Sequence, residues 1–365
     1  MSRPKVIYIA ATRQNEGKTT LSLGLMGELV RRGMKVGFIK PVGQQYVEAE
    51  GVKVDKDSLL LTRVFHVDAA LRDTSPVAVD RYFTRNYIDN PEPEKLQRLI
   101  LESFERVADG KDVVIVEGTG HAGVGAVLDL SNAQVAKLLD APVIIISSGG
   151  IGRPVDEIIL NRGVFDREGV RIAGAVVNKV LVDKYEMAHD YVRRALEYNG
   201  LKLLGAMPEA TQLSRLTLRQ VTRDIDAEVM VGSDHLDNAV QRLIIGAMTA
   251  HNALSYLAPG VLMITGGDRD DLLLAAAGFS FMNPEPENVM AGIILTGGMV
   301  PHTSIREMLK HGAFPVLLHE QDSYTVAAKV HNLVAKIQLQ DTKKHQVAIK
   351  MVQEYFDVDG LLSLL

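Results

Sequence analysis

Strand-like apolar runs alternate with helix-like segments along the first two hundred residues. The runs lie at residues 6–10, 35–39, 112–116, 142–148, 172–177 and 202–206. Several are continuously apolar, which is typical of strands that a parallel sheet buries on both faces. Between them, apolar residues recur at helical spacing, as Leu21, Leu25 and Leu29 do. This alternation predicts an α/β fold with a mostly parallel sheet and helices on both faces.

A shorter α/β pattern follows. Strands are expected at residues 227–232, 261–266, 292–296 and 314–318, and helices begin near residues 304 and 324. The polar stretch 211–223 is interpreted as a linker and a first helix. We therefore predict two domains, residues 1–212 and 213–365, and expect residues 341–365 to form helices packed on the second domain. The segment 81–96 is interpreted as an excursion without regular structure.

The first strand leads into a phosphate-binding pattern. The polar loop 12–16 precedes Gly17-Lys18-Thr19-Thr20, which opens a helix. Backbone N–H groups at a helix N-terminus favour phosphate, Lys18 adds a positive charge, and Thr19 stands where such loops ligate Mg²⁺. The usual pattern has glycine at the position of Thr12. The residues predicted to contact a nucleotide here are Thr12, Asn15, Glu16, Gly17, Lys18, Thr19 and Thr20.

Polar residues follow other predicted strands, where open α/β sheets bind ligands. Lys40 is either a ligand contact or a solvated lysine, and Asp57 is either functional or part of an acidic first helical turn. Glu117 precedes glycines and suits a metal-bound phosphate site, or it caps a turn. Asn178 is suited to read an adenine edge and equally suited to cap a turn.

Composition narrows the class of protein. The chain has 365 residues, 47% of them apolar and 23% charged, as in globular proteins. A net charge of −5 argues against a general binder of nucleic acid or membrane surfaces. Without cysteine there are no disulfides or thiolate sites, and no apolar run is long enough to span a membrane. Because the first strand begins within five residues, no signal peptide is expected, and we predict a cytoplasmic location.

Taken together, the motifs of residues 1 to about 212 resemble those of dethiobiotin synthetase and related P-loop amidoligases such as cobyrinic acid diamide synthases. The phosphate loop of that family matches residues 11–19, and its Lys-Pro pair matches Lys40-Pro41. The resemblance implies ATP and Mg²⁺ as cofactors and catalytic roles for Lys18 and Lys40. It also implies Mg²⁺ ligands and base contacts, which map onto Thr19, Asp57 and Glu117 and onto Asn178, Gly205 and Pro208 respectively.

One feature of that family is missing. Its small hydroxyl residue after the Lys-Pro pair, which contacts the substrate, is not evident at Gly43, Gln44 and Gln45.

The second region resembles the DRTGG domain, regarded as regulatory in long bacterial phosphotransacetylases. The chain is similar to their N-terminal half and ends where the acyltransferase domain would begin. Two segments, 268–269 and 296–298, follow strands of this region, and they form an anion pocket or a helix cap with a glycine turn.

Two functional hypotheses follow. The first is a regulatory protein that binds Mg-ATP in one domain and a small-molecule ligand or partner protein in the other. The second is an ATP-dependent ligase that transfers a phosphoryl group to a carboxylate or carbamate through Lys18 and Lys40. The resemblance to dethiobiotin synthetase also implies a homodimer.

Overall fold

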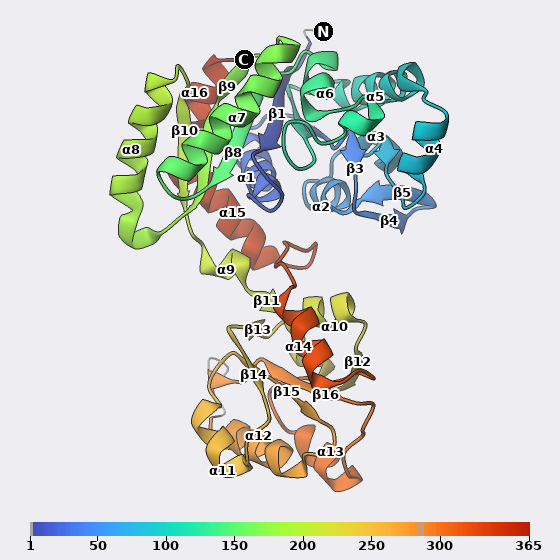
Figure 1. Cartoon of the computed structure of the whole chain (residues 1–365), viewed down its shortest axis with the longest axis vertical. Coiled ribbons are helices and arrows are strands. Elements are labelled where there is room, and N and C mark those ends of the chain that lie inside the picture. The colour runs from blue at the N-terminus through green and yellow to red at the C-terminus, as the bar shows by residue number, and fades with distance from the viewer. Residues whose placement is uncertain (1–2, 284, 286–287) are drawn as a thin grey trace. The chain divides into compact units, whose positions relative to one another are not determined.

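The computed structural model describes residues 3–283, 285 and 288–365 and divides into two compact units (Figure 1). Unit 1 comprises Met1–Ala210 together with Ile337–Leu365, and unit 2 comprises Thr211–Lys336. Unit 2 is therefore an insertion within the chain of unit 1. The first boundary lies close to the predicted one at residue 212, whereas the C-terminal residues belong to the first unit.

Unit 1 is built on a six-stranded sheet in the order β10-β9-β8-β1-β7-β2, with every neighbouring pair parallel. This arrangement confirms the predicted fold class. Two small sheets pair β3 with β6 and β4 with β5. The strands of unit 1 are β1 (Lys5–Ala11), β2 (Val36–Ile39), β3 (Val42–Gly43), β4 (Tyr46–Ala49), β5 (Val52–Asp55), β6 (Val77–Ala78), β7 (Val113–Glu117), β8 (Val143–Ser148), β9 (Ile172–Val180) and β10 (Leu203–Pro208).

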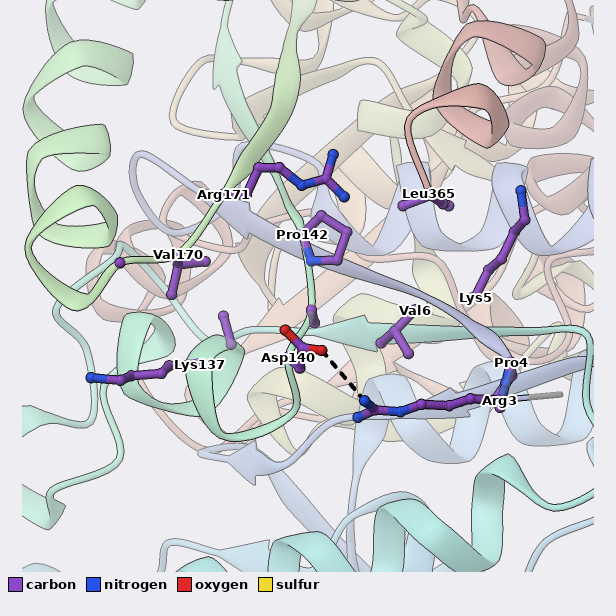
Figure 2. Close-up of a pocket in the computed structure, with 13 residues that line it drawn as sticks. Arg3, Pro4, Lys5, Val6, Lys137, Asp140, Pro142, Val170, Arg171 and Leu365 are labelled. Carbon is purple, nitrogen blue, oxygen red and sulfur yellow. Dashed lines mark hydrogen bonds and ion pairs between the residues drawn. The ribbon is translucent and has the colours of Figure 1, made fainter.

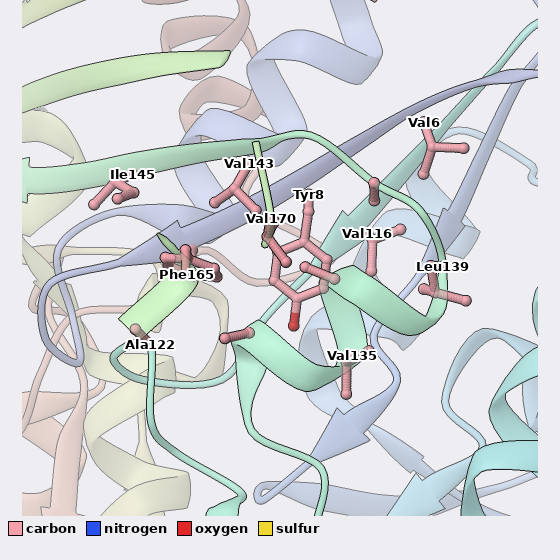
Figure 3. Close-up of a cluster of buried hydrophobic side chains, with 14 of the residues drawn as sticks. Val6, Tyr8, Val116, Ala122, Val135, Leu139, Val143, Ile145, Phe165 and Val170 are labelled. Carbon is pink, nitrogen blue, oxygen red and sulfur yellow. The ribbon is translucent and has the colours of Figure 1, made fainter. Parts of the chain in front are cut away.

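Helices cover both faces of this sheet. On one face, Val6, Tyr8 and Ala10 of β1 join a core that α5 to α8 complete. Figure 3 shows part of this core, with Tyr8 near Val135 of α6 and Phe165 of α7. Successive strand residues point to opposite faces, so the fully buried Ile7 and Ile9 lie on the other side, with α1 and α15. The helices of unit 1 are α1 (Lys18–Arg31), α2 (Lys56–Val64), α3 (Leu71–Thr74), α4 (Phe83–Asp89), α5 (Pro93–Ala108), α6 (Asn132–Leu138), α7 (Gly152–Glu168), α8 (Tyr185–Tyr198), α15 (Thr342–Tyr355) and α16 (Val358–Ser363).

The expectation of an irregular excursion at 81–96 is wrong in part, because the segment contains α4 and the start of α5. Only one residue of α4, Tyr87, is buried, so the helix has no apolar stripe by which its sequence would reveal it. The Tyr87 hydroxyl donates a hydrogen bond to Asp129 Oδ2 at 3.0 Å. Among helices in the described ranges of both units, none is long and apolar enough to cross a membrane.

The placement of the C-terminal helices corrects the sequence interpretation. Helix α15 packs on α1 in unit 1, and not on the second domain as predicted. The contact is close because α1 carries Gly24 and Gly27, where an added Cβ would lie 2.3 Å from Val352 Cγ2 and 2.4 Å from Ile349 Cγ1, respectively. The chain then pairs with β10, where the Asp357 N–H donates to Leu204 O at 2.7 Å. Nothing in the local pattern of residues 341–365 identifies this partner.

Unit 2 contains a five-stranded sheet in the order β12-β17-β16-β15-β14, parallel except for the edge strand β12. Separate apolar clusters cover its two faces. Its strands are β11 (Leu216–Thr217), β12 (Glu228–Val231), β13 (Ala239–Val240), β14 (Arg242–Ile245), β15 (Val261–Gly266), β16 (Gly292–Thr296) and β17 (Val316–Leu318). Its helices are α9 (Thr211–Ser214), α10 (Leu218–Ile225), α11 (Ala250–Ala253), α12 (Asp270–Met282), α13 (Thr303–Leu309) and α14 (Ser323–His331).

Candidate functional site

The predicted phosphate-binding loop connects β1 to α1 at the carboxyl edge of the parallel sheet. Two residues of the loop, Asn15 and Gly17, have positive φ angles of 61° and 103°. Asparagine tolerates this conformation and glycine adopts it freely. An added Cβ at Gly17 would also lie 2.1 Å from Asn178 Nδ2, so glycine is required there for space as well. The loop thus leads into the N-terminus of α1 as a phosphate site requires.

Lys18 and Thr19 lie beside Glu117, which comes from the end of β7. The Thr19 hydroxyl donates to Glu117 Oε1 at 3.2 Å, and the Ser22 hydroxyl donates to Oε2 at 2.7 Å. Lys18 Nζ donates to Gly120 O at 3.4 Å. Burial lowers the pKa of Lys18, although the charge of Glu117 opposes this shift. Burial likewise raises the pKa of Glu117, so both groups have lost much of their hydration.

Lys40, after β2, is surrounded by carboxylates. Its Nζ lies 3.0 Å from Asp55 Oδ1 and 3.5 Å from Glu117 Oε1, and it also pairs with Asp57. Burial disfavours the charged form of Lys40, but the charges of Asp57, Glu117 and Asp55 outweigh it and raise its pKa. Lys40 is therefore a buried ammonium, and the predicted residues Lys18, Thr19, Lys40, Asp57 and Glu117 form one cluster.

Asp55 is a member of this cluster that the sequence interpretation missed. It is buried at the end of β5, and its side chain caps α2 by accepting the Asp57 N–H at 3.0 Å. Asp57 lies in the first turn of α2, whereas the Asp55 carboxylate caps the helix from outside it and also faces Lys40. Its place at the end of a strand, two residues before Asp57, is the one signal that the sequence offers.

Asn132, which is not among the predicted site residues, holds the loop that follows Glu117. Its Oδ1 accepts the Thr119 N–H at 3.0 Å, and its Nδ2 donates to Thr119 O at 2.8 Å. An added Cβ at Gly118 would lie 2.4 Å from this Oδ1, so the glycine permits the close approach. The side chain of Asn132 comes from the start of α6 and has no sequence motif that marks it.

The predicted base contacts lie at the same edge of the sheet. Asn178 is buried at the end of β9, and its Nδ2 donates to Glu16 O in the phosphate loop at 2.9 Å. Pro208 ends β10. Gly205 contacts the C-terminal segment instead, since an added Cβ there would lie 2.6 Å from Tyr355 O. Recognition of adenine by Asn178 and Pro208 remains a prediction.

The remaining loop residues have partners on neighbouring elements. The buried Thr12, where the usual pattern has glycine, donates its hydroxyl to Glu157 Oε2 at 3.0 Å. Glu16 is buried and accepts a hydrogen bond from Ser148. Thr20 is half-buried in the first turn of α1. All the residues predicted to contact a nucleotide or Mg²⁺ therefore lie in unit 1.

The donor set around Glu117 suits Mg²⁺. Thr19, Asp57 and Glu117 offer hydroxyl and carboxylate oxygens, the ligands that this ion prefers. Three carboxylates, including Asp55, face Lys40, so the cluster carries more negative than positive groups at that point. Within the part of the chain that the structure describes, no three His, Asp or Glu side chains form a complete metal site.

A cavity of about 340 Å³ lies at the opposite, amino end of the strands (Figure 2). Two of the basic side chains that line it bind backbone carbonyls near the C-terminus. Lys5 Nζ donates to Leu362 O at 2.7 Å, and Arg171 Nη1 donates to Leu364 O at 2.7 Å. Arg3 pairs with Asp140 at 3.4 Å. None of the predicted site residues lines this cavity. Its basic side chains instead bind the segment after α15.

In unit 2, the strand ends expected to form a pocket are neighbours in the sheet. Gly266 pairs with Thr296, so the segments 268–269 and 296–298 lie at the same edge. Much of their polar backbone is used internally: the N–H groups of Gly297 and Gly298 donate to Gln321 O and His319 O at 2.9 and 3.1 Å. An added Cβ at Gly267 would lie 1.6 Å from Met299 O. The glycines thus allow close packing of loops, and a ligand here remains a prediction.

Comparison with known proteins identifies both units. Residues 5–217 match the AAA domain family and residues 220–333 match the DRTGG domain family. The phosphate acetyltransferase of Nitratidesulfovibrio vulgaris is 28% identical over 369 residues, an alignment that covers 98% of this chain and 51% of that enzyme. The enzyme of Pseudomonas aeruginosa is 29% identical over 374 residues, with coverage of 97% and 51%. The chain spans about half the length of these relatives.

Solved structures resemble the chain more distantly. The septum site-determining protein MinD from Pyrococcus horikoshii, complexed with Mg-ADP, has a TM-score of 0.38 and 16% identity over 57% of this chain and 83% of its own. The family matches confirm the resemblance inferred from the sequence. The chain belongs to the family of the AAA domain that it matches, joins that P-loop domain to a DRTGG domain, and is related to bacterial phosphate acetyltransferases.

Proposed function

We propose that unit 1 binds Mg-ATP and that unit 2 senses a ligand or partner, so that the chain acts as a nucleotide-dependent regulatory protein. One observation carries this proposal. Lys18 and Thr19 of the phosphate loop meet Glu117 and Lys40 in a single buried cluster, although these residues come from three separate strand ends. Such convergence of buried charges at a carboxyl sheet edge is typical of a ligand site.

Each residue of the cluster has a role in this proposal. Lys18 and the N–H groups that begin α1 neutralise the phosphates, and Asn178 and Pro208 contact the base. Thr19, Asp57 and Glu117 hold Mg²⁺, which when bound would neutralise phosphate charge. Asp55 faces Lys40 at 3.0 Å and keeps its ammonium beside the phosphates.

The path of the chain supports a regulatory role for unit 2. The chain leaves unit 1 after β10 and returns into α15, which packs on α1, the helix of the phosphate loop. Within unit 1, β10 is also bonded to the residue that follows α15 through the Gly205–Phe356 bridge. A ligand that binds unit 2 would act on unit 1 through these two segments, one of which leads into the helix packed on α1, and coupling between two sites requires such a link.

A second function, an ATP-dependent ligase, is favoured by the geometry of Lys40. Its charge lies 3.5 Å from Glu117 and is thus placed to stabilise a transferring phosphoryl group. Lys18 would share this role, and the acceptor would be a carboxylate or a carbamate. Catalysis would come from positioning and charge and would need no protein nucleophile.

The two functions differ in turnover. We would measure ADP release from Mg-ATP by the full chain, alone and with a deproteinised metabolite extract, and use Lys18→Ala as the blank. A ligase releases ADP when extract is present, and Lys40→Ala abolishes this release while much ATP affinity remains. A regulatory protein binds Mg-ATP without release above the blank. Equal turnover by wild type and Lys40→Ala would exclude the ligase mechanism.

We also propose a homodimer, as the resemblance to dethiobiotin synthetase implies. Light scattering during size-exclusion chromatography, with and without Mg-ATP, tests this assembly. A protein that remains monomeric at tens of micromolar in both conditions would contradict it.

A further inference from the structure

The phosphate loop of this chain departs from the usual pattern at Thr12, and the structure shows what accompanies the departure. Thr12 is buried, its N–H donates to Ile146 O on β8 at 2.9 Å, and its hydroxyl lies 3.0 Å from Glu157 Oε2 on α7. The hydroxyl also lies 3.0 Å from Ser147 Oγ, so Thr12 bonds the loop both to the carboxylate of α7 and to the end of β8. Glycine at this position would make no such contact.

Glu157 binds more than Thr12. Its side chain is only 12% exposed, and its Oε1 pairs with Arg13 at 2.7 Å and with Arg153 at 2.8 Å. The Ser147 hydroxyl at the end of β8 lies 3.5 Å from Oε2. One carboxylate from α7 thus holds two consecutive loop residues, Thr12 and Arg13, against the end of the neighbouring strand.

The carboxylate is held in its charged form. Burial alone would raise the pKa of Glu157, but hydrogen bonds from Arg153 and Thr12 and the charge of Arg13 outweigh burial and lower it. Charge-assisted hydrogen bonds of this kind are stronger and more directional than neutral ones. These charged hydrogen bonds therefore stabilise the contact between α7 and the loop, although the side chains of Arg13 and Arg153 are 59% and 64% exposed.

The same helix face also holds the loop of Glu117. One turn after Glu157, Asn161 donates from Nδ2 to Glu157 O at 2.9 Å and accepts the Ala122 N–H on Oδ1 at 2.9 Å. Ala122 lies five residues after Glu117. A single face of α7 therefore contacts both loops that converge on the proposed nucleotide site.

From this geometry we infer that Glu157 is a positioning residue for nucleotide binding. It fixes the phosphate loop through Arg13 and through Thr12, the residue that stands where the usual pattern has glycine. The inference rests on the proposed binding of Mg-ATP. It assigns no contact between Glu157 and the nucleotide. The carboxylate acts through the loop, which it holds in the conformation that directs backbone N–H groups toward phosphate.

Charge and positioning make opposite predictions for Glu157→Gln. Removing a carboxylate near the loop makes the site more positive, which by itself would tighten the binding of a polyphosphate. Loss of positioning would weaken binding, because the loop would no longer be held in one conformation. The sign of the change in the Kd of Mg-ATP therefore separates a positioning residue from a simple counter-charge.

The experiment is titration calorimetry of Mg-ATP with the full-length chain, with the thermal midpoint recorded for each variant. Glu157→Gln and Thr12→Val should each raise the Kd about tenfold. Glutamine loses the ion pair with Arg13, and valine lacks the hydroxyl that bonds the loop to the carboxylate. The double variant should be little weaker than either single one, since both remove the same contact. Thr12→Ser, which keeps the hydroxyl, should restore binding even if Thr12→Val folds poorly.

Arg153→Gln is the matched control, because Arg153 binds the same carboxylate from outside the loop. It should change the Kd by less than about threefold, as expected for an exposed ion pair. Unchanged or tighter binding by Glu157→Gln, with wild type binding normally, would overturn this inference and leave the proposed function intact. A wild-type protein that does not bind Mg-ATP would overturn the proposed function and this inference with it.

Discussion

The packing of α15 on α1 makes a quantitative prediction at Gly24. An added Cβ at this position would lie 2.3 Å from Val352 Cγ2 and 2.6 Å from the backbone Ala348 O. A side chain can change rotamer, but the carbonyl belongs to the backbone of α15, so the helix itself must shift. Gly24→Ala therefore tests whether the C-terminal helix is fixed on the helix of the phosphate loop.

Two opposing effects set the size of the change. Overpacking of a close contact costs about 1–3 kcal/mol. Alanine in place of glycine inside a helix stabilises by about 0.5–1 kcal/mol. We therefore expect Gly24→Ala to lower the free energy of unfolding of unit 1 by roughly 1–2 kcal/mol, which at this size shifts the midpoint by about 2–4 °C per kcal/mol.

Gly163 provides a matched control. It lies in the interior of α7, and an added Cβ there would have no atom within 4 Å. Gly163→Ala should thus stabilise the protein by about 0.5–1 kcal/mol. Thermal and urea denaturation followed by circular dichroism measure both variants, and limited proteolysis reports release of α15. A Gly24→Ala protein as stable as Gly163→Ala would refute the placement of α15.

Three further predictions concern unit 1. Hydrogen bonds from Arg31, with others from Arg32 and Gln353, lower the pKa of the buried Glu28 to about 2. Its contribution to stability is therefore complete above pH 4.5 and lost as the pH falls toward 2, and acid titrations of unfolding should show that Glu28→Gln reduces this loss. Lys40→Ala leaves buried carboxylates without a counter-charge and should destabilise unit 1 by about 3–5 kcal/mol in urea denaturation, and adding Asp55→Asn should recover part of this loss. Residues 1–210 alone should unfold without cooperativity in calorimetry, whereas a version joined to 337–365 should unfold cooperatively, and equal cooperativity in both would contradict the division into units.

Local pattern was enough to predict the strands and the phosphate loop. Each strand of the six-stranded sheet is a short apolar run. The loop lies between a strand and a helix, and the apolar pattern identifies each of these two elements without reference to the loop. The clustering of Lys18, Lys40 and Glu117 was also predictable, because the carboxyl ends of parallel strands meet at one edge. These inferences depend only on residues near one another in sequence and on the regular geometry of the sheet.

The supporting residues were not predictable in this way. Asn132 and Glu157 contact the site from helices α6 and α7, and neither has a motif, since only their position in space gives them a role. The docking of α15 depends on a match between Gly24 on one helix and Val352 on another, 328 positions later in the chain. Such contacts are set by tertiary packing, which leaves no periodic signal in either segment.

Titration calorimetry of Mg-ATP with wild type and with Lys18→Ala tests whether unit 1 binds this nucleotide at the phosphate loop. We expect saturable binding of Mg-ATP by wild type, with one site per chain. Lys18→Ala, folded as judged by circular dichroism, should lose at least about tenfold in affinity, because the variant lacks a buried charge beside the phosphates. Absence of binding by wild type, or equal binding by a folded Lys18→Ala, would show that the phosphate loop does not bind Mg-ATP.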